Sequence, residues 1–340
     1  MIVIDGSEGE GGGQVLRTAL ALSMVGGKPF RLERIRARRA KPGLQRQHLT
    51  AVLAAAKVSQ ATLAGAEMHS QQLTFTPGEV RPGEYVFSIG TAGSATLVLQ
   101  TVLPPLLTAS GPSQLRIEGG THNTLAPPFE FFAHAFLPLL NRMGPVVEAD
   151  LVAHGFYPAG GGRVDVKVQP AERLQPLDLL ERGRVVGRQV RAIVSRLPLH
   201  IAEREAETVR RGLGWPADAA RAEEVSSPGP GNAVLAEIQA EHVTEVFIGF
   251  GERGVPAEKV AAGVVREARR WLEAGVPVSE HLADQLLLPL ALAGGGQFRS
   301  LAPSGHTQTN AATIQKFLDV AVAFEQQADD DWLVRVVRPT

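Results

Sequence analysis

The stretch Ile2-Val-Ile-Asp-Gly-Ser-Glu-Gly-Glu-Gly-Gly-Gly-Gln-Val-Leu-Arg17 joins a short apolar strand to an apolar helix through a glycine-rich turn. The helical spacing of apolar residues continues from Val15 to Val25. Glycines between a strand and a helix allow the backbone to approach another group closely. The stretch therefore predicts a fold in which strands and helices alternate.

The same alternation recurs along the chain. Strands are expected at Ile2–Ile4, Gln72–Phe75, Tyr85–Ile89, Gln114–Ile117, Val164–Val168 and Leu333–Val337. Helices are expected at Val15–Val25, Gln45–Ala56, Thr96–Thr108, Phe129–Met143, Glu203–Leu213, Ala257–Ala274, Ala283–Ala293 and Ala311–Ala323. Strand patterns often follow one another closely, which favours an α+β fold with split βαβ units.

Three helices begin in a similar way, with a short polar or glycine-containing element before an apolar run. These elements are Gly12-Gly-Gln14, Gly90-Thr-Ala-Gly-Ser94 and Ala283-Asp-Gln285. The similarity suggests a diverged internal repeat. The region from Gly187 to Pro277 has a denser charge and the pattern strand, helix, strand, strand, helix. It predicts a small inserted α/β domain, the alternative being a more charged surface of one continuous domain.

Composition narrows the class of protein. The 340 residues include 34 Lys and Arg against 35 Asp and Glu, which excludes a histone-like polycation and an acidic tail protein. Hydrophobic residues make up 44%, as in globular proteins. The absence of cysteine excludes disulfides, Cys-based zinc sites and thiol catalysis. With no signal peptide, and with a most apolar stretch, Leu286–Ala293, too short to span a bilayer, we expect a cytoplasmic protein without a membrane segment.

The glycine-rich turn is a candidate anion site, because backbone N–H groups before a helix can face a phosphate. It lacks the Gly-Lys-Ser/Thr ending of a P-loop and the Rossmann spacing. Glu8 and Glu10 would repel phosphate unless a divalent cation lay between the carboxylates and the phosphate. Glu10 is therefore a candidate Mg²⁺ or Mn²⁺ ligand, the alternative being a turn with solvated acids.

A basic run extends from Arg31 to Arg46 in a chain of near-zero net charge. Its cationic residues are Arg31, Arg34, Arg36, Arg38, Arg39, Lys41 and Arg46, against the single acid Glu33. The alternation of Arg34, Arg36 and Arg38 predicts a strand with these side chains on one face. The run favours a polyanion site, because Arg binds phosphate bidentately, over a solvated sheet edge.

Four further residues could carry chemistry. His306 is expected in a loop just before a helix, where imidazole can act as a base, a metal ligand or a nucleophile, or simply as polar surface. His48, at a helix start, is open to the same alternatives. Asp284 and Gln285 could cap a helix, or contact a base edge or a ribose.

Together these stretches resemble the RNA 3′-terminal phosphate cyclases. The matching motifs are Asp5-Gly…Gly-Glu-Gly-Gly-Gly-Gln-Val-Leu-Arg17, Ile35-Arg-Ala-Arg-Arg-Ala-Lys-Pro-Gly-Leu…Gln47-His48-Leu, Gly93-Ser-Ala-Thr-Leu-Val-Leu-Gln100-Thr, His154-Gly-Phe-Tyr-Pro-Ala-Gly-Gly-Gly162, Glu280-His-Leu-Ala-Asp-Gln285 and Gly305-His306…Thr309-Asn310. Each motif alone is modest, but they run in order from end to end.

The resemblance implies an α+β fold in which three split βαβαββ units form a large domain, residues 1–184 plus 280–340. A smaller, thioredoxin-like α/β domain, residues 185–279, would be inserted into it. The resemblance also implies a reaction. His306 would attack the α-phosphate of ATP, and the AMP would pass to an RNA 3′-phosphate. Attack by the neighbouring 2′-OH would then form a 2′,3′-cyclic phosphate and release AMP.

The resemblance further implies residue roles. Glu10 would hold the divalent metal, and Arg17, Arg36 and Arg39 would neutralise phosphate charge with support from Gln47 and His48. The ATP site would comprise Gln100, Pro127, His281, Leu282, Ala283, Asp284 and Gln285, with Pro127 against the adenine. Many relatives have Tyr where this chain has His281, which offers less stacking area.

Two alternatives share parts of this pattern. A non-catalytic RNA-binding factor, as in a ribosome-assembly branch of the same fold, would keep the basic run but lack the nucleophilic histidine. An enolpyruvyl transferase would also gather arginines, around a small phosphorylated substrate. Glu10, His306 and the pair Asp284–Gln285 together favour the cyclase. The sequence leaves the oligomeric state open, a homodimer included.

Overall fold

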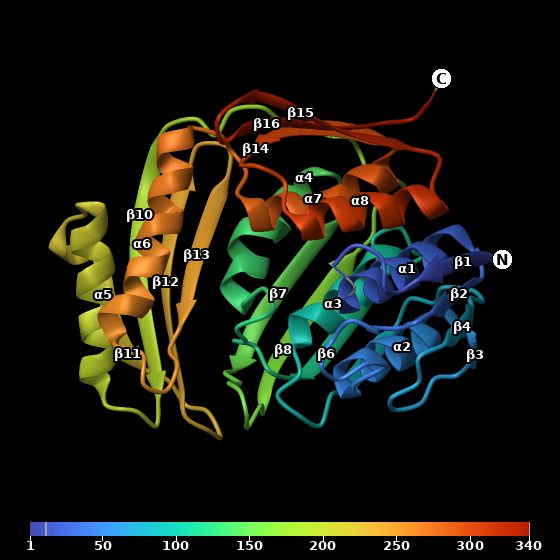
Figure 1. Ribbon diagram of the computed structural model, residues 1–340, viewed down its shortest axis with the longest axis horizontal. Helices are drawn as coiled ribbons and strands as arrows, with labels where there is room; N and C mark the ends of the chain where they lie inside the picture. Colours follow the sequence, from blue (N-terminus) through green and yellow to red (C-terminus); the bar gives the residue numbers. More distant parts are fainter. Residues whose placement is uncertain (11, 340) are drawn as a thin grey trace.

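The computed structural model describes residues 1–10 and 12–339 and shows a mixed fold of small sheets and helices (Figure 1). This confirms the predicted combination of strands and helices. Four sheets of four strands each are present among the described residues. In that part of the chain no helix is both long and apolar enough to cross a membrane.

The first two sheets share one strand order. The first has the order β1-β2-β4-β3 and the second β5-β6-β8-β7, each with one parallel pair and two antiparallel pairs. The elements of the first are β1 (Ile2–Asp5), α1 (Gly13–Gly26), β2 (Phe30–Glu33), α2 (Arg46–Ser59), β3 (Thr62–Ala64) and β4 (Leu73–Thr76). Those of the second are β5 (Glu84–Ser88), α3 (Ala95–Leu106), β6 (Ser113–Gly119), the π-helix η1 (Phe131–Phe136), α4 (Leu137–Arg142), β7 (Val146–Ala153) and β8 (Gly162–Gln169).

The third sheet, in the order β15-β16-β14-β9, combines strands that are distant in the sequence. Its elements are β9 (Leu177–Leu179), α7 (Glu280–Ala293), β14 (Gly295–Ser300), α8 (Gly305–Phe317), β15 (Ala321–Ala328) and β16 (Asp331–Val337). Read from β9, the order is again first, second, fourth, third. Helices α1, α3, α7 and α8 gather between the three sheets, where α1 contacts α3 and α8 and α7 contacts α8 (Figure 1).

The fourth sheet lies between β9 and α7 in the sequence and stands apart at one side of Figure 1. Its order is β11-β10-β12-β13, with β10 parallel to β11 and the other pairs antiparallel. Its elements are β10 (Val185–Ser195), α5 (Leu199–Leu213), the 3-10 helix η2 (Ala217–Ala219), β11 (Ala220–Glu224), β12 (Gly231–Ala240), β13 (Thr244–Phe250) and α6 (Ala257–Ala274). We propose that residues 185–279 form the inserted domain.

Both boundaries of the last predicted helix are wrong, and so is the predicted arginine strand. Helix α8 begins at Gly305 rather than Ala311, so His306 lies in its first turn and not in a preceding loop. The expected helical residues beyond Phe317 instead enter β15 at Ala321. The predicted arginine strand is a compact turn, because β2 ends at Glu33 and both Arg34 and Arg36 have positive φ, 51° and 54°.

Aromatic packing fixes α8 against the first sheet. The rings of Phe30 in β2 and Phe317 at the end of α8 meet edge to face, with centroids 5.9 Å apart. The ring of Phe75 in β4 also stacks on Phe30, with centroids 5.8 Å apart. The Lys28 ammonium donates to the Phe317 carbonyl at 2.6 Å. Burial of these rings therefore holds the helix that carries His306 close to the glycine-rich turn.

A buried glutamate anchors the start of α7. Ser279 is the N-cap of this helix, and its hydroxyl accepts from the Leu282 amide. Glu245 of β13 accepts from the Ser279 amide at 2.5 Å and lies 3.0 Å from the Ser279 hydroxyl. Because burial outweighs these hydrogen bonds, the pKa of Glu245 is raised to about 8. The fourth sheet thus holds the N-terminus of α7 through a carboxyl that is neutral at pH 7.

Replacement of this carboxyl gives a pH-dependent prediction. Between pH 4.5 and about 8 the folded chain retains a proton on Glu245 that the unfolded chain has released, so stability should fall as the pH rises. Glu245→Gln, which mimics the neutral acid, should remove up to about 1.4 kcal/mol of this loss per pH unit. Urea unfolding at pH 5 and pH 8 measures the difference. Glu252→Gln, at an exposed position, is the control; equal pH slopes in Glu245→Gln and the wild type would contradict the prediction.

Candidate active site

The centre of the candidate site is the exposed imidazole of His306, in the first turn of α8. Ser304 caps this helix by accepting from the Thr307 amide at 3.1 Å. The His306 Nδ1 lies 3.3 Å from the Gln14 Oε1 of α1. An amide oxygen only accepts, so Nδ1 carries the proton and Nε2 presents a lone pair to solvent.

A half-buried carboxylate, that of Asp284, orients the Gln14 amide. Gln14 donates through Nε2 to the Asp284 Oδ1 at 2.5 Å, and Asn310 donates to the same oxygen at 3.1 Å. Gln285 donates to the Asp284 Oδ2 at 3.1 Å and accepts from Gln100 of α3. Burial raises the pKa of Asp284 against the opposing effects of Gln14 and the His306 charge. Asp284 and Gln285 lie inside α7, so the helix-cap interpretation is wrong: Ser279 is the cap.

The glycine-rich turn lies against α8. The Glu10 amide donates to the Thr309 hydroxyl at 3.2 Å, and that hydroxyl donates to the Gly305 carbonyl at 2.7 Å. Gly9 has φ of +56°, and a Cβ there would lie 2.3 Å from the Thr309 Oγ1. A Cβ on Gly305 would lie 2.5 Å from a Glu10 carboxylate oxygen. Glycine at both positions brings the Glu10 carboxylate to the start of α8.

Arg17 and His48 meet at the start of α1. A Cβ on Gly13 would lie 2.4 Å from the His48 Nε2 and 2.8 Å from the Arg17 Nη1, so only glycine fits between them. His48 accepts the Gln45 amide on Nδ1 at 3.2 Å, which leaves its proton on Nε2. Burial, with the charges of Arg17 and Arg36, lowers the pKa of His48 to about 3. His48 is therefore a neutral donor beside a guanidinium.

The arginine turn after β2 adds further positive charge. Arg39 donates to the Glu10 carbonyl at 3.0 Å, and its Nη2 lies 4.0 Å from the Glu10 Oε2. Arg36 donates to the Lys41 carbonyl at 2.6 Å, and its pKa is lowered by burial and by the charge of Arg39. By contrast, Arg34 is paired with Asp5. The turn therefore directs Arg39 toward the site and Arg34 toward β1.

The remaining predicted residues are less closely joined to this centre. Gln47 accepts the Ser94 amide at 2.8 Å, and the Pro127 carbonyl accepts the Thr96 hydroxyl at 2.7 Å. Both contacts are with the start of α3. The side chains of Leu282 and Ala283 are fully buried in the core and do not face solvent. His281 is exposed, and no hydrogen bond joins it to the His306 network within residues 1–10 and 12–339.

Three residues that link the centre are not among the sequence-predicted site residues. Gln14 connects His306 to Asp284, Asn310 connects Asp284 to the Thr18 hydroxyl at 2.8 Å, and Thr309 connects α8 to Glu10. All three lie within the motifs quoted above, Gln14 directly after the glycines. Their motif positions are a signal, but uncharged side chains carry no charge pattern that distinguishes them.

Comparison with known proteins identifies the family of the chain. Residues 8–324 match the family described as RNA 3′-terminal phosphate cyclase. Proteins of that name from Koribacter versatilis, Ralstonia nicotianae and Salmonella enteritidis are 52%, 54% and 49% identical to this chain. The alignments cover 96%, 96% and 99% of this chain and 92%, 94% and 98% of the relatives. These matches define the class of protein as an enzyme that acts on phosphate. The chain belongs to the RNA 3′-terminal phosphate cyclase family.

Proposed function

We propose that this enzyme uses ATP to convert an RNA 3′-terminal phosphate into a 2′,3′-cyclic phosphodiester. The observation that carries the proposal is the exposed imidazole of His306, whose Nδ1 is held by Gln14, which in turn donates to Asp284. Arg17 acts electrostatically on the same Asp284, and Arg39 donates to the Glu10 carbonyl in the adjoining glycine-rich turn. Family membership supports the same activity. The absence of cysteine and the need for ATP and RNA make the cytoplasm the proposed compartment.

In the first step His306 acts as the nucleophile. Its Nε2 attacks the α-phosphorus of ATP, a P–N bond forms, and the bond to pyrophosphate breaks. The Gln14 Oε1 accepts a hydrogen bond from Nδ1–H, which keeps the Nε2 lone pair available. Asp284, next to Gln14 and within the electrostatic reach of His306, stabilises the positive charge that develops on the ring.

In the second step an oxygen of the RNA 3′-phosphate attacks the phosphorus of the histidyl-AMP, which frees His306 and forms an RNA–ppA end. The vicinal 2′-OH then attacks the terminal RNA phosphorus, loses its proton and expels AMP. A phosphate monoester is a poor electrophile, and AMP supplies the leaving group that it lacks. The fixed 2′-OH makes this ring closure intramolecular.

Cationic residues and a divalent metal would balance the phosphate charge. Arg17 is desolvated by burial, which lowers its pKa to about 10, and it remains a cation at pH 7. Arg39 and the neutral His48 Nε2–H supply further donors. The half-exposed carboxylate of Glu10 fits Mg²⁺ or Mn²⁺, which prefer oxygen ligands, and the ion would supply charge neutralisation. Gln100, Gln285, Pro127 and His281 would contribute to the adenosine side of the site.

The test is transfer of label from protein to RNA. The chain is incubated with ATP carrying radioactive α-phosphate and a divalent metal, and the denatured protein is tested for an acid-labile, base-stable adduct. We expect an RNA 3′-phosphate to discharge this label and to become a 2′,3′-cyclic end, while the same RNA with a 3′-OH leaves the label in place. RNA binding without any label, in protein free of bound AMP, would instead favour a non-catalytic RNA-binding factor.

Removal of the proposed metal ligand should change the metal dependence. Glu10→Ala should require more Mg²⁺ or Mn²⁺ for half-maximal labelling, because the carboxylate no longer contributes to ion binding. The measurement is the initial rate of labelling against metal concentration. Glu8→Ala is the matched control, since Glu8 is held by the Lys316 ammonium at 2.9 Å. An unchanged titration in Glu10→Ala would exclude its role as a ligand.

A further inference from the structure

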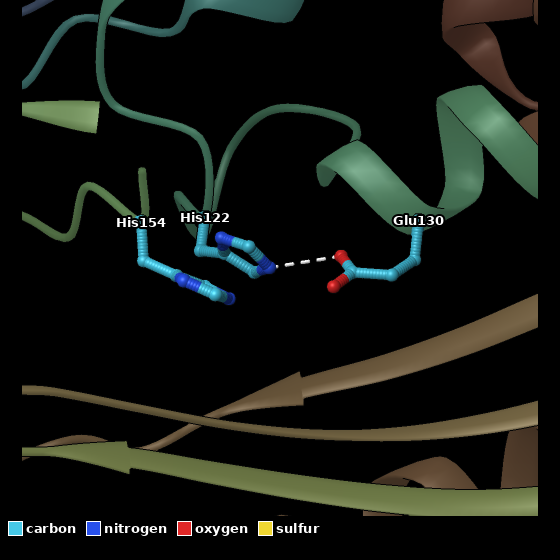
Figure 2. Close-up of side chains that lie close together, drawn as sticks. All are labelled: His122, Glu130 and His154. Atoms are coloured by element: carbon cyan, nitrogen blue, oxygen red, sulfur yellow. Dashed lines mark hydrogen bonds and ion pairs between the residues drawn. The ribbon is translucent and has the colours of Figure 1, made fainter. Parts of the chain in front are cut away.

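A second cluster of ligand-type side chains lies outside the His306 network. His122 follows β6, His154 follows β7, and Glu130 directly precedes η1 (Figure 2). The His122 Nε2 is 2.8 Å from the Glu130 Oε2. The two imidazole rings stack with centroids 5.3 Å apart. One nitrogen or oxygen from each residue lies within 4.8 Å of the others.

The cluster is shielded from solvent and incompletely paired. His122 is 2% and Glu130 is 5% exposed. His154 is half-buried, but its Nε2 is shielded, and across the described part of the chain no donor or acceptor reaches that nitrogen. A buried polar atom without a partner costs free energy, so it commonly has a partner such as water or an ion. The unpaired His154 Nε2 therefore indicates a missing ligand beside Glu130.

The hydrogen bonding of His122 suits a cation. The His122 Nδ1 lies 2.9 Å from the Thr121 Oγ1. That hydroxyl can accept a hydrogen bond from Nδ1–H when an ion replaces the proton on Nε2.

The surrounding charges also permit a dication. Arg191 of β10 donates to the Glu130 Oε1 at 2.7 Å and is also paired with Glu223 of β11. Arg221 also lies 4.0 Å from Glu223, so two carboxylates and two guanidiniums balance and leave no excess positive charge among these four groups. The Glu130 Oε2, on the side of His122, remains available to an ion. Nearby, His134 is paired with Glu237 at 2.7 Å and adds no unpaired carboxylate.

We propose that His122, Glu130 and His154 bind one divalent transition-metal ion, with Zn²⁺ as the best match. Two imidazole nitrogens and one carboxylate oxygen are a common zinc ligand set, with a fourth position left for water. Tetrahedral ligands at about 2.0–2.1 Å from zinc stand about 3.4 Å apart. Small side-chain rotations would shorten the longest distance between ligand atoms, which is at most 4.8 Å, and lengthen the 2.8 Å contact between the His122 Nε2 and the Glu130 Oε2. The ion would join two loops of the second sheet to η1, at the place where Arg191 reaches across from the fourth sheet.

The test measures zinc binding rather than activity. The full-length chain is stripped with a chelator and titrated with Zn²⁺ against a chromophoric competitor. We expect one ion per chain. In His154→Ala and in Glu130→Gln the affinity for zinc should fall by about 100-fold or more, because loss of even an outer partner of a metal ligand lowers metal affinity 10–100-fold. His134→Ala removes a neighbouring histidine, and Glu10→Ala removes the proposed metal ligand of the other site. Both should bind zinc like the wild type.

Two results would overturn the proposal. One is a wild-type chain that takes up no stoichiometric zinc, and the other is a folded His154→Ala variant with wild-type affinity. Either would leave the cluster as a hydrogen-bonded network only. If His154→Ala does not fold, Co²⁺ replaces Zn²⁺ in the wild-type chain. Intense visible absorption of a four-coordinate ion would support the site, and the weak spectrum of hydrated Co²⁺ would exclude it.

Discussion

His306→Ala is expected to abolish covalent attachment of AMP while leaving the fold intact. The alanine methyl group has no lone pair to attack phosphorus. Among residues 1–10 and 12–339 no other histidine is hydrogen-bonded to Gln14. Because His306 is exposed, the substitution removes little packing. The measurement is radioactivity retained on the denatured protein after incubation with α-labelled ATP, with circular dichroism as the check on folding.

A second histidine variant separates the loss of a nucleophile from a general effect. His242 is also exposed, lies in the loop between β12 and β13, and contacts the Glu181 carbonyl at 3.1 Å. His242→Ala should be labelled like the wild type. Label retained in folded His306→Ala would mean that another residue is the nucleophile, and the proposed mechanism would then be wrong.

Arg39→Ala is expected to have the next largest effect, a loss of about 2–4 kcal/mol of transition-state stabilisation. This corresponds to a rate of cyclisation that is lower by about 30-fold to 1000-fold. Arg39 is partly exposed and reaches Glu10 through the Glu10 carbonyl, so its guanidinium lies where phosphate charge would gather. The measurement is the single-turnover rate with an RNA 3′-phosphate at saturating ATP.

The matched control for Arg39 is Arg81→Ala. Arg81 is exposed and is paired with the exposed Glu79 at 3.4 Å, in the connection between β4 and β5. Its replacement should leave the rate unchanged. A near-wild-type rate in Arg39→Ala would make this arginine part of the solvated surface, which is the alternative interpretation of the basic run.

The elements that could be predicted from the sequence are those fixed by contacts between residues close together in the chain. The helix from Val15 to Val25 has a continuous apolar pattern, and α1 spans Gly13–Gly26. Alternating arginines predicted a strand, but the chain turns there because Arg34 and Arg36 adopt positive φ and Arg34 pairs with Asp5. A tertiary ion pair of this kind leaves no periodicity in the sequence.

The candidate site could likewise be predicted only where the residues themselves, and not their distant contacts, indicate a role. Glu10, Arg39 and His306 carry charge or a titratable ring within glycine-rich or basic stretches, so residue chemistry alone makes them candidates. Gln14 and Asn310 are essential to the geometry only because Asp284, more than twenty residues from Asn310 and 270 from Gln14, accepts from both. Conversely, the neighbours of Asp284 within its motif, Leu282 and Ala283, face the core.

The contact between the Glu10 amide and the Thr309 hydroxyl spans 299 positions in the sequence. At a synthesis rate of about 5–20 residues per second, the ribosome needs about 15–60 s to travel from one to the other. A nascent chain therefore carries the glycine-rich turn and its arginines well before it carries α8. Translation that stops before residue 305 yields a product with the cationic half of the proposed site and no nucleophile, so incomplete chains cannot consume ATP in this reaction.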